Sequence, residues 1–351
     1  MSEPKNTSVR DFEEHFHHYI HQKVQVSSLK GEIYQQLWNS ICELTSAGKR
    51  IRPHQFLMAY QLLGGEDIAT SLQVATALEL LHTALILHDD IVDQDLTRRG
   101  QPNPIGSFSR SAQDQGITPD ISLRWGEANA LLAGDLLISQ AFKILGTLEC
   151  DSSIRRKILD EFETSVELAA SGEQMDLALA WDLLPALPEH IITMMYRKTS
   201  HYSFQLPLIL AGLLTHTDHK NLDALRAIGR LQGEIFQITD DVLGVFGETQ
   251  VTGKSNDSDL KQGKRTLLIA IASQHSHWEQ HRHAWDNAQA TDEQIQEFKQ
   301  FLRDSGAEQN IEDLIQRKYQ QCLTLVNQSQ LPVSLKKQLS TFAQHLMERK
   351  S

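Results

Sequence analysis

Two segments of the sequence carry aspartates among apolar residues. The first is LELLHTALILHDDIVD at residues 78–93, and the second is GRLQGEIFQITDDVLGVFGE at residues 229–248. Carboxylates are costly in apolar surroundings unless something positive meets them. Paired carboxylates on two helices suit Mg²⁺, a hard cation that takes oxygen ligands and usually shares them with substrate phosphates. The two segments therefore predict a magnesium site for a diphosphate or triphosphate ligand.

Helical spacing places the functional side chains of each segment on one face. Positions seven apart nearly coincide on a helix and positions four apart share a face, so His82, Asp89 and Asp93 form one stripe. Gln237 lies three and four residues before Asp240 and Asp241. A lone aspartate pair is more typical of a helix end that frays into solvent. The second acidic segment favours the metal-binding interpretation.

Lysine and arginine residues lie before and after the two aspartate-containing segments. Guanidinium and ammonium groups match phosphate oxygens, and the cluster before Pro53 lies at the positive end of an expected helix. Each cation alone is more typical of a solvated surface, but together they predict a phosphate-binding set around the acidic face: Lys49, Arg50, Arg52, Arg98, Arg99, Lys198, Lys254 and Lys264.

The elements that position these residues are predicted to be helices throughout. Apolar residues recur three and four apart almost along the whole chain, whereas alternating β-branched runs are scarce. Irregular stretches are expected from Gln101 to about Leu123, in WDLLPALPEH, and over residues 247–264. No repeat or low-complexity linker divides the sequence, so we expect one all-α domain over residues 1–351, a bundle of long helices.

Composition excludes several other classes. The formal net charge of −12 argues against nucleic-acid binding, which relies on Lys and Arg. Cys42, Cys150 and Cys322 lack the number and spacing of a disulfide framework or zinc site, so a reducing cytoplasm fits best. No signal peptide or uninterrupted apolar run of membrane-spanning length is evident, and no integral membrane association is expected. The histidines other than His82, as in HFHHYIH and QHSHWEQHRH, are interpreted as solvated.

Between about Gly48 and Thr266 the sequence resembles the all-trans isoprenyl diphosphate synthases, or trans-prenyltransferases. The motifs that carry the resemblance are GKRIRP at 48–53, HTALILHDDIVD at 82–93 with RRG at 98–100, GDLL at 134–137, GEQMD at 172–176, KT at 198–199, FQITDD at 236–241, and VTGK with GKRT ending at 266. The resemblance implies an enzyme of the isoprenoid synthase fold, with its helices around a central active-site cavity, that joins isopentenyl diphosphate to an allylic diphosphate.

The resemblance also assigns roles to individual residues. Asp89 and Asp93 would bind two Mg²⁺ ions and Asp240 a third, and Mn²⁺ can replace Mg²⁺ in such sites; Asp90 and Asp241 are secondary acids. The allylic diphosphate, which is dimethylallyl, geranyl or farnesyl diphosphate, would meet Arg98, Lys198, Lys254 and Lys264. Isopentenyl diphosphate would meet Lys49, Arg52, His82 and Arg99. Thr199 and Gln237, with Lys198, would lie beside the reacting carbons.

The implied reaction is ionisation, condensation and elimination. The allylic diphosphate leaves, the double bond of isopentenyl diphosphate attacks the resulting cation, and a proton is lost, with the released diphosphate as the expected base. No enzyme nucleophile is required. Two positions depart from the family pattern. Gly244 stands where the second motif often has a third acid, and Glu173 stands where Gln is frequent.

Product length depends in this family on residues one and two turns before Asp89. Ala84 and Leu85 are not aromatic, so the expected product is geranylgeranyl diphosphate or longer, with Leu81 and Leu78 as a deeper floor. The same residues can also be plain core residues. Farnesyl or longer polyprenyl synthesis remains open as an alternative, as do a terpene cyclase, which needs no second diphosphate site, and a non-catalytic synthase subunit. The resemblance implies a homodimer.

Overall fold

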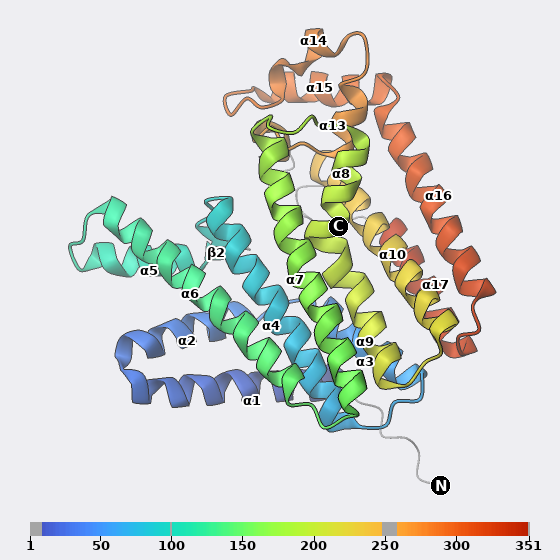
Figure 1. Cartoon of the computed structure of the whole chain (residues 1–351). Coiled ribbons are helices and arrows are strands. Elements are labelled where there is room, and N and C mark those ends of the chain that lie inside the picture. The colour runs from blue at the N-terminus through green and yellow to red at the C-terminus, as the bar shows by residue number, and fades with distance from the viewer. Residues whose placement is uncertain (1–8, 99, 248–257, 350–351) are drawn as a thin grey trace. The chain divides into compact units, whose positions relative to one another are not determined.

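Helices make up nearly all of the secondary structure in the computed structural model, which describes residues 9–98, 100–247 and 258–349 (Figure 1). The predicted all-α fold is confirmed. In these ranges the only strands are the two-residue β1 (Thr97–Arg98) and β2 (Gln101–Pro102), which pair antiparallel. The chain divides into two compact units: residues 1–160 with 210–216, and residues 161–209 with 217–351.

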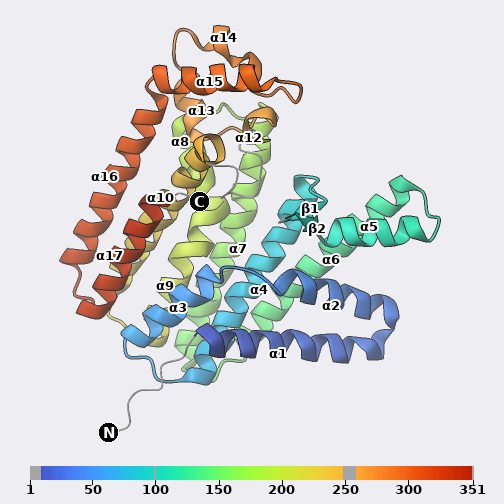
Figure 2. The same cartoon turned by 180° about the vertical axis from the view of Figure 1, so that it is seen from behind.

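The first unit holds the N-terminal helices. Helices α1 and α2 form an antiparallel hairpin, as do α5 and α6 (Figures 1 and 2). The elements are α1 (Val9–Ser27), η1 (Ser28–Lys30), α2 (Glu32–Thr45), α3 (Ile51–Leu62), α4 (Ile68–Val92), β1, β2, α5 (Pro104–Asp114), α6 (Pro119–Gly146) and the start of α7 (Ser152–Ala180). Helix α4 is the centre of this unit and packs chiefly against α6.

Helix α4 is apolar on nearly all sides because it is the core of the first unit. Val74, Leu78, Leu81 and Leu87 are at most 1% exposed. Burying a leucine side chain contributes roughly 1.5–3 kcal/mol, so this helix is fixed by packing on several sides. A rigid α4 fixes in turn the direction of the acidic residues at its C-terminal end.

The second unit is built on α10 (His219–Phe246). This helix packs against the π-helix η2 (Tyr196–Gln205) and against α16 (Ala307–Gln328), with α17 (Val333–Met347) folded back beside α16 (Figure 2). The unit also contains the rest of α7, α8 (Pro188–Met195), the first residues of α9 (Leu206–Leu214), whose remainder belongs to the first unit, α12 (Ser258–Lys261), α13 (Leu267–Ala272), α14 (Trp278–His281), η3 (Arg282–Ala284) and α15 (Asp292–Asp304).

The expectation of one irregular stretch from Gln101 to about Leu123 is wrong. Helix α5 begins at Pro104, where Asn103 caps it by accepting a 2.9 Å hydrogen bond from the Gly106 amide, and α6 begins at Pro119. Proline is favoured at the first helical position, and an asparagine cap stabilises a helix by about 1 kcal/mol. Residues that read as loop formers are therefore helix starts.

The other two expected breaks have different outcomes. The WDLLPALPEH turn is confirmed, because α7 ends at Ala180 and α8 begins at Pro188. Of the third stretch, residues 248–257 lie outside the described residues, and α12 occupies Ser258–Lys261.

Among the described residues, α4 and α6 are long and apolar enough to cross a membrane by length and composition. The sequence expectation rested on the lack of an uninterrupted apolar run, which is a stricter criterion. In α4 the buried share of the most apolar window is 72%, which its place in the core explains, whereas in α6 the share is 39%. The exposed apolar residues of α6 thus need a separate account.

Candidate active site

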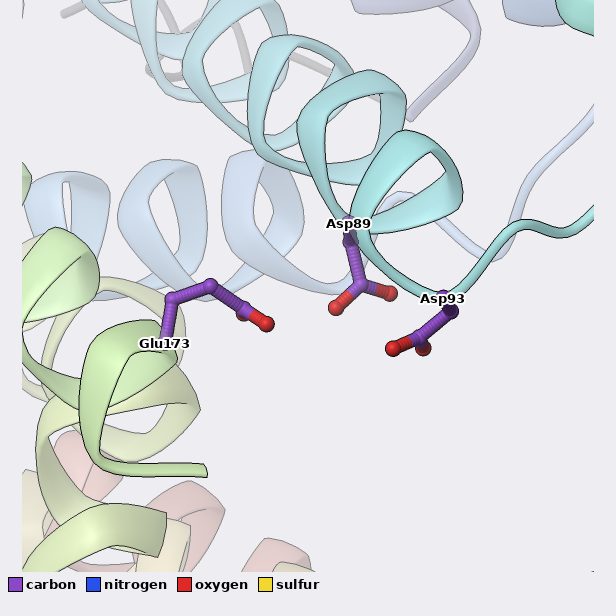
Figure 3. A group of neighbouring side chains, drawn as sticks. All are labelled: Asp89, Asp93 and Glu173. Atoms are coloured by element: carbon purple, nitrogen blue, oxygen red, sulfur yellow. The ribbon is translucent and has the colours of Figure 1, made fainter. Parts of the chain in front are cut away.

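Two aspartates project together from the C-terminal end of α4. The nearest carboxylate oxygens of Asp89 and Asp93 lie within 4.8 Å of each other (Figure 3). Asp89 is half-buried and Asp93 is exposed, so both carboxylates are accessible from solution. Two oxygen donors one turn apart, on a helix fixed by core packing, fit a hard divalent cation. These are the residues that the sequence predicts as magnesium ligands.

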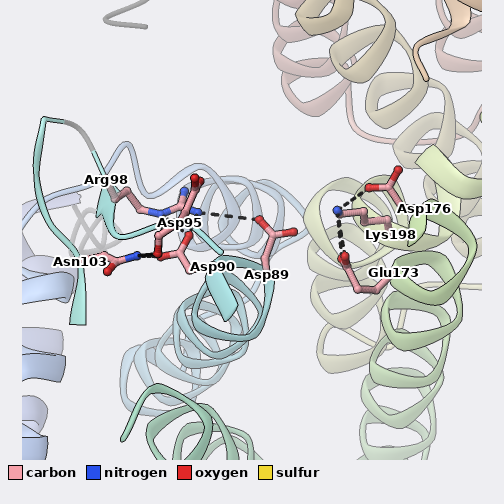
Figure 4. A network of polar contacts seen from close by, with 8 residues as sticks. All are labelled: Asp89, Asp90, Asp95, Arg98, Asn103, Glu173, Asp176 and Lys198. Carbon is pink, nitrogen blue, oxygen red and sulfur yellow. Dashed lines mark hydrogen bonds and ion pairs between the residues drawn. The ribbon is translucent and has the colours of Figure 1, made fainter. Parts of the chain in front are cut away.

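Asp90 has a different environment from its neighbour. It is 1% exposed and is bound by Arg98 Nη2 and by Asn103 Nδ2, the latter at 3.0 Å (Figure 4). Burial raises the pKa of the Asp90 carboxyl, while the Arg98 and Asn103 hydrogen bonds oppose that shift. Because Asn103 also binds the Asp95 carbonyl and caps α5, Asp90 ties the end of α4 to the β1–β2 turn.

Arg98 lies next to both aspartates, Asp89 and Asp90. Its Nη2 atom bonds Asp90 and lies 3.8 Å from Asp89 Oδ2 (Figure 4). The guanidinium is 30% exposed, so part of it remains open to a ligand beside the acidic pair. Arg99, the next predicted phosphate ligand, lies outside the described residues.

Three further predicted phosphate-binding residues of the first unit lie close together: Lys49 and Arg50 in the turn between α2 and α3, and Arg52 in the first turn of α3. Lys49 is exposed and Arg52 half-buried, whereas Arg50 between them is 4% exposed. The Arg50 guanidinium binds Glu79 Oε1 at 2.8 Å and Glu13 Oε1 at 3.0 Å. His82 is half-buried on α4, two turns before Asp89.

The predicted chain-length residues belong to the core helix. Leu78, Leu81 and Ala84 are at most 1% exposed, and Leu85 is half-buried. These residues have two interpretations: the floor of a tail-binding channel and ordinary core packing. Both require buried side chains, so the burial does not distinguish between them.

In the second unit, Lys198 is held by two carboxylates of α7. Its Nζ atom lies 3.0 Å from Glu173 Oε2 and 2.7 Å from Asp176 Oδ2 (Figure 4). The contact is close because Gly172 leaves room: a Cβ there would lie 2.2 Å from the Lys198 backbone nitrogen. Lys198 and the half-buried Thr199 lie in η2, and π-helical turns are frequent at functional sites.

His201, in the same π-helix, is an exception to the expectation of solvated histidines. It is 2% exposed, and Ser165 Oγ of α7 lies 2.9 Å from its Nδ1 atom. Burial lowers the pKa of His201 to about 4, so the ring is neutral at physiological pH. It helps to hold η2 against α7.

The second acidic motif lies near the end of α10. Gln237 and Asp241 are half-buried and Asp240 is exposed. Arg349 Nη1 lies 3.0 Å from Asp240 Oδ1, and the Arg349 guanidinium also covers the Phe236 ring. A cation bound at Asp240 Oδ1 would compete with this arginine.

The remaining predicted cations give less information. Lys264 is exposed, and its carbonyl accepts hydrogen bonds from the Thr266 amide and from the Trp285 indole. Lys254 lies outside the described residues.

The sequence alone missed the carboxylate partners of the cations. Asp176 was visible in the GEQMD motif, but nothing in the sequence says that it binds Lys198. Glu13 and Glu79 lie in no recognised motif. Each is an acid within a predicted helix, and nothing else in the sequence marks it as a partner of Arg50. The acidic pair of α4 fits a magnesium ion, because Asp89 and Asp93 offer the oxygen donors that this ion prefers.

Comparison with known proteins gives the family. The polyprenyl synthetase family profile matches residues 33–305. A geranylgeranyl diphosphate synthase from Saccharolobus solfataricus is 29% identical over 314 residues, covering 87% of this chain and 88% of that protein. An octaprenyl diphosphate synthase from Haemophilus influenzae is 32% identical over 234 residues, covering 66% of this chain and 63% of that protein.

A solved structure shows the same fold. The geranylgeranyl pyrophosphate synthase from Corynebacterium glutamicum, complexed with isoprenyl diphosphate and magnesium, has a TM-score of 0.87 and 24% identity, and the match covers 97% of this chain and 99% of that one. The fold is therefore that of the isoprenoid synthases. With the family match over most of the chain, these findings show that the chain belongs to the polyprenyl synthetase family, as a prenyltransferase that elongates trans-prenyl diphosphates.

Proposed function

We propose that the protein makes geranylgeranyl diphosphate by adding isopentenyl diphosphate to an allylic primer. The observation that carries the product length is the absence of an aromatic ring at Ala84 and Leu85, one turn before Asp89 on the core helix. The similarity to a geranylgeranyl diphosphate synthase over 87% of the chain supports the same product.

The first unit supplies the binding groups for isopentenyl diphosphate. Lys49 is exposed and Arg52 half-buried at the start of α3, and His82 stands on α4 beside them in the proposal. Arg99 completes the proposed set. These side chains would bind and orient the diphosphate so that the double bond is presented to the allylic carbon, which lowers the entropic cost of bringing two substrates together.

Asp89, Asp93 and Asp240 would hold the magnesium ions. When bound, these ions neutralise the charge that develops on the departing diphosphate. Arg98, Lys198, Lys254 and Lys264 would add direct contacts to the same phosphate oxygens. The ion pairs of Lys198 with Glu173 and Asp176 keep the ammonium group in one position before substrate binds.

The bond changes balance without an enzyme nucleophile. The carbon–oxygen bond of the allylic diphosphate breaks, a carbon–carbon bond forms to the terminal carbon of isopentenyl diphosphate, and a proton leaves to restore a double bond. Thr199 and Gln237 would face the reacting carbons, where their dipoles stabilise positive charge. The released diphosphate is the proposed base.

A longer polyprenyl product is the second candidate. The similarity to an octaprenyl diphosphate synthase at 32% identity favours it. The small side chain of Ala84 and the aliphatic side chains of Leu81 and Leu78, which precede it on the helix, also favour it. A terpene cyclase or a silent subunit is less well supported, because the acidic pair of α4 and the basic turn at Lys49 and Arg52 are both present.

Product chromatography decides between these lengths. Purified protein is incubated with Mg²⁺, labelled isopentenyl diphosphate and, separately, dimethylallyl, geranyl and farnesyl diphosphate, and the dephosphorylated alcohols are separated. A single twenty-carbon alcohol supports the proposal. A ladder of longer alcohols supports the second candidate, and a fifteen-carbon stop contradicts both.

Substitution Ala84→Phe gives a matched test of the floor. The phenyl ring would fill the space one turn before Asp89 and stop growth earlier, so the product should shorten by one five-carbon unit. Leu37→Phe, at a buried leucine of α2 outside the proposed floor, is the control and should leave the twenty-carbon product in place. An unchanged product from folded Ala84→Phe protein would show that the tail does not pass this residue.

We further propose that the protein works as a homodimer in the cytoplasm. Support for the dimer comes from α6, where Ile121, Trp125, Leu131 and Leu132 are 40–60% exposed. Their spacing puts Ile121, Trp125 and Leu132 on one stripe of the helix. A second copy of α6 is the proposed cover for that stripe.

A further inference from the structure

Arg50 occupies an unusual backbone position at the start of α3. It precedes the helix with φ 47° and ψ 37°, in the left-handed region. A side chain other than glycine is disfavoured there, because its Cβ approaches the backbone too closely. Asparagine and aspartate tolerate the region better than arginine does. Such a conformation persists only when surrounding contacts fix it, so something other than local preference determines this turn.

The contacts of the Arg50 side chain supply that determinant. Its guanidinium binds Glu13 of α1 through Nε at 3.0 Å, Glu79 of α4 through Nη1 at 2.8 Å, and the Thr45 carbonyl of α2 through Nη2. It also lies over the Phe16 ring, 5.1 Å from its centroid. One side chain, 3% exposed, thus connects α1, α2 and α4 to the start of α3.

The charge balance makes these contacts hard to replace. Glu79 is 5% exposed and Glu13 31% exposed, so at least one carboxylate is buried with Arg50 as its cation. A planar guanidinium can bind two carboxylates and a carbonyl at once, whereas an ammonium group on a flexible stem cannot reproduce that fork. The site therefore selects arginine and not only a positive charge.

The turn that Arg50 fixes carries Lys49 and leads into the first turn of α3, which carries Arg52. Because the Arg50 side chain is directed into the fold, Lys49 on one side of it is exposed and Arg52 on the other is half-buried. Glu79 lies three residues before His82 on α4, so the two share a helix face. The Arg50–Glu79 bond therefore fixes the turn relative to the face of α4 that carries His82.

We propose that Arg50 is a positioning residue for the isopentenyl diphosphate site. It does not touch the substrate; its buried bonds to Glu13 and Glu79 hold the left-handed turn, so that Lys49 and Arg52 meet the same diphosphate as His82. The inference rests on the proposed function, in which Lys49, Arg52 and His82 hold isopentenyl diphosphate.

Steady-state kinetics of Arg50→Lys test the inference. The variant keeps the charge and loses the fork. The KM for isopentenyl diphosphate should rise about tenfold, while the KM for the allylic primer and kcat change less than about twofold, since only ground-state binding of one substrate is weakened. Glu13→Gln keeps Arg50 and weakens one of its bonds, so it should raise the same KM by a smaller factor. If Arg50→Lys does not fold, Glu13→Gln alone tests the inference by the same measurement.

A matched control separates positioning from stability. Arg226 forms a two-bond ion pair with Glu161, at 2.7 and 3.1 Å, in the second unit. Arg226→Lys removes a fork from a half-buried arginine outside the proposed substrate sites and should lower the melting temperature without a selective rise in the KM for isopentenyl diphosphate. If Arg50→Lys and Glu13→Gln behave like this control, Arg50 is merely structural and the inference is wrong.

Failure of the proposed function has a separate signature. Wild-type protein that is folded but incorporates no isopentenyl diphosphate contradicts the function itself. Wild-type protein that elongates the primer, with equal changes of both substrate KM values in Arg50→Lys, contradicts only the positioning role. Lys49→Ala provides the direct comparison, because removing a proposed contact with the diphosphate should raise the KM for isopentenyl diphosphate with the backbone turn intact.

Discussion

At the scale of single residues, Asp89 and Asp90 are chemically identical neighbours with different surroundings. Asp89 is half-buried and faces Asp93 within 4.8 Å, whereas Asp90 is 1% exposed and bound by Arg98 and Asn103. The proposed metal ligand and the structural acid thus differ only in the direction in which the helix points them. Their substitutions should have opposite consequences.

Asp89→Asn should abolish elongation activity and leave the free energy of unfolding nearly unchanged, because it removes a ligand oxygen from an accessible site. Asp90→Asn should lower the free energy of unfolding by about 1–3 kcal/mol, because it breaks a buried charged hydrogen-bond network. Urea unfolding and product formation are measured on both proteins. Equal destabilisation by the two changes would contradict the distinction drawn between them.

At the scale of elements, the close contact of the π-helix η2 with α7 depends on Gly172 and His201 as well as on the ion pairs of Lys198. Gly172 allows the Lys198 backbone to approach, and Ser165 binds the buried His201. These contacts set the place of Lys198 and Thr199. Neither is visible in the periodicity of the sequence, which predicts that two helices exist but not how closely they approach.

Gly172→Ala should lower the free energy of unfolding by about 1–3 kcal/mol, because overpacking a close helix contact forces the backbone apart. A Cβ at this position would lie 2.2 Å from the Lys198 nitrogen. Gly146→Ala is the control, since a Cβ there meets nothing within 4 Å. Chemical denaturation compares the two, and equal stabilities would show that α7 and η2 can separate at no cost.

The buried His201 gives a pH dependence with a definite sign. Its pKa is lowered from 6.5 to about 4 in the folded protein, so the unfolded chain takes up a proton first as pH falls. Stability from this group is present above pH 6.5 and is lost on acidification toward pH 4, by about 3 kcal/mol in all.

The measurement is the free energy of unfolding from pH 7.5 to 4.5 for wild-type protein and His201→Gln. The acid-induced loss should be smaller in the variant. His219→Gln is the control, because His219 is 89% exposed and its removal should leave the pH slope unchanged. Parallel slopes for wild type and His201→Gln would contradict the burial account.

The particular residues also show how much of this arrangement the sequence predicts. Helix periodicity predicts the all-α class, and the spaced motifs predict the aspartates near the C-terminal ends of α4 and α10. The Pro- and Gly-rich residues after Gln101 mislead because Pro104 and Pro119 are helix starts. Arg50 is indistinguishable in sequence from Lys49 and Arg52, and only the contacts with Glu13 and Glu79 show that it faces inward.

At the scale of the whole molecule, the apolar stripe on α6 is a feature that packing within the described residues does not explain. Ile121 and Leu132 are 60% and 56% exposed on a helix that packs on α4. Exposed apolar groups gathered in this way are typical of protein interfaces. The isologous contact of two α6 helices is the simplest cover in a symmetric dimer.

Leu132→Lys should therefore convert the protein to a monomer, because a charge in the centre of an apolar interface is costly to desolvate. Light scattering should give twice the 39.7 kDa of one chain for wild-type protein and the single-chain mass for the variant. Leu183→Lys is the control, at a leucine that is 75% exposed in the turn after α7, and it should remain dimeric. A monomeric wild type would contradict the proposal.

The most direct test of the whole account is the transfer of label from isopentenyl diphosphate into an extractable prenyl product by the purified protein. We expect incorporation that requires an allylic primer and Mg²⁺ together and that is lost in Asp89→Asn. Folded wild-type protein that incorporates no label with any of the three primers would contradict chain elongation as its function.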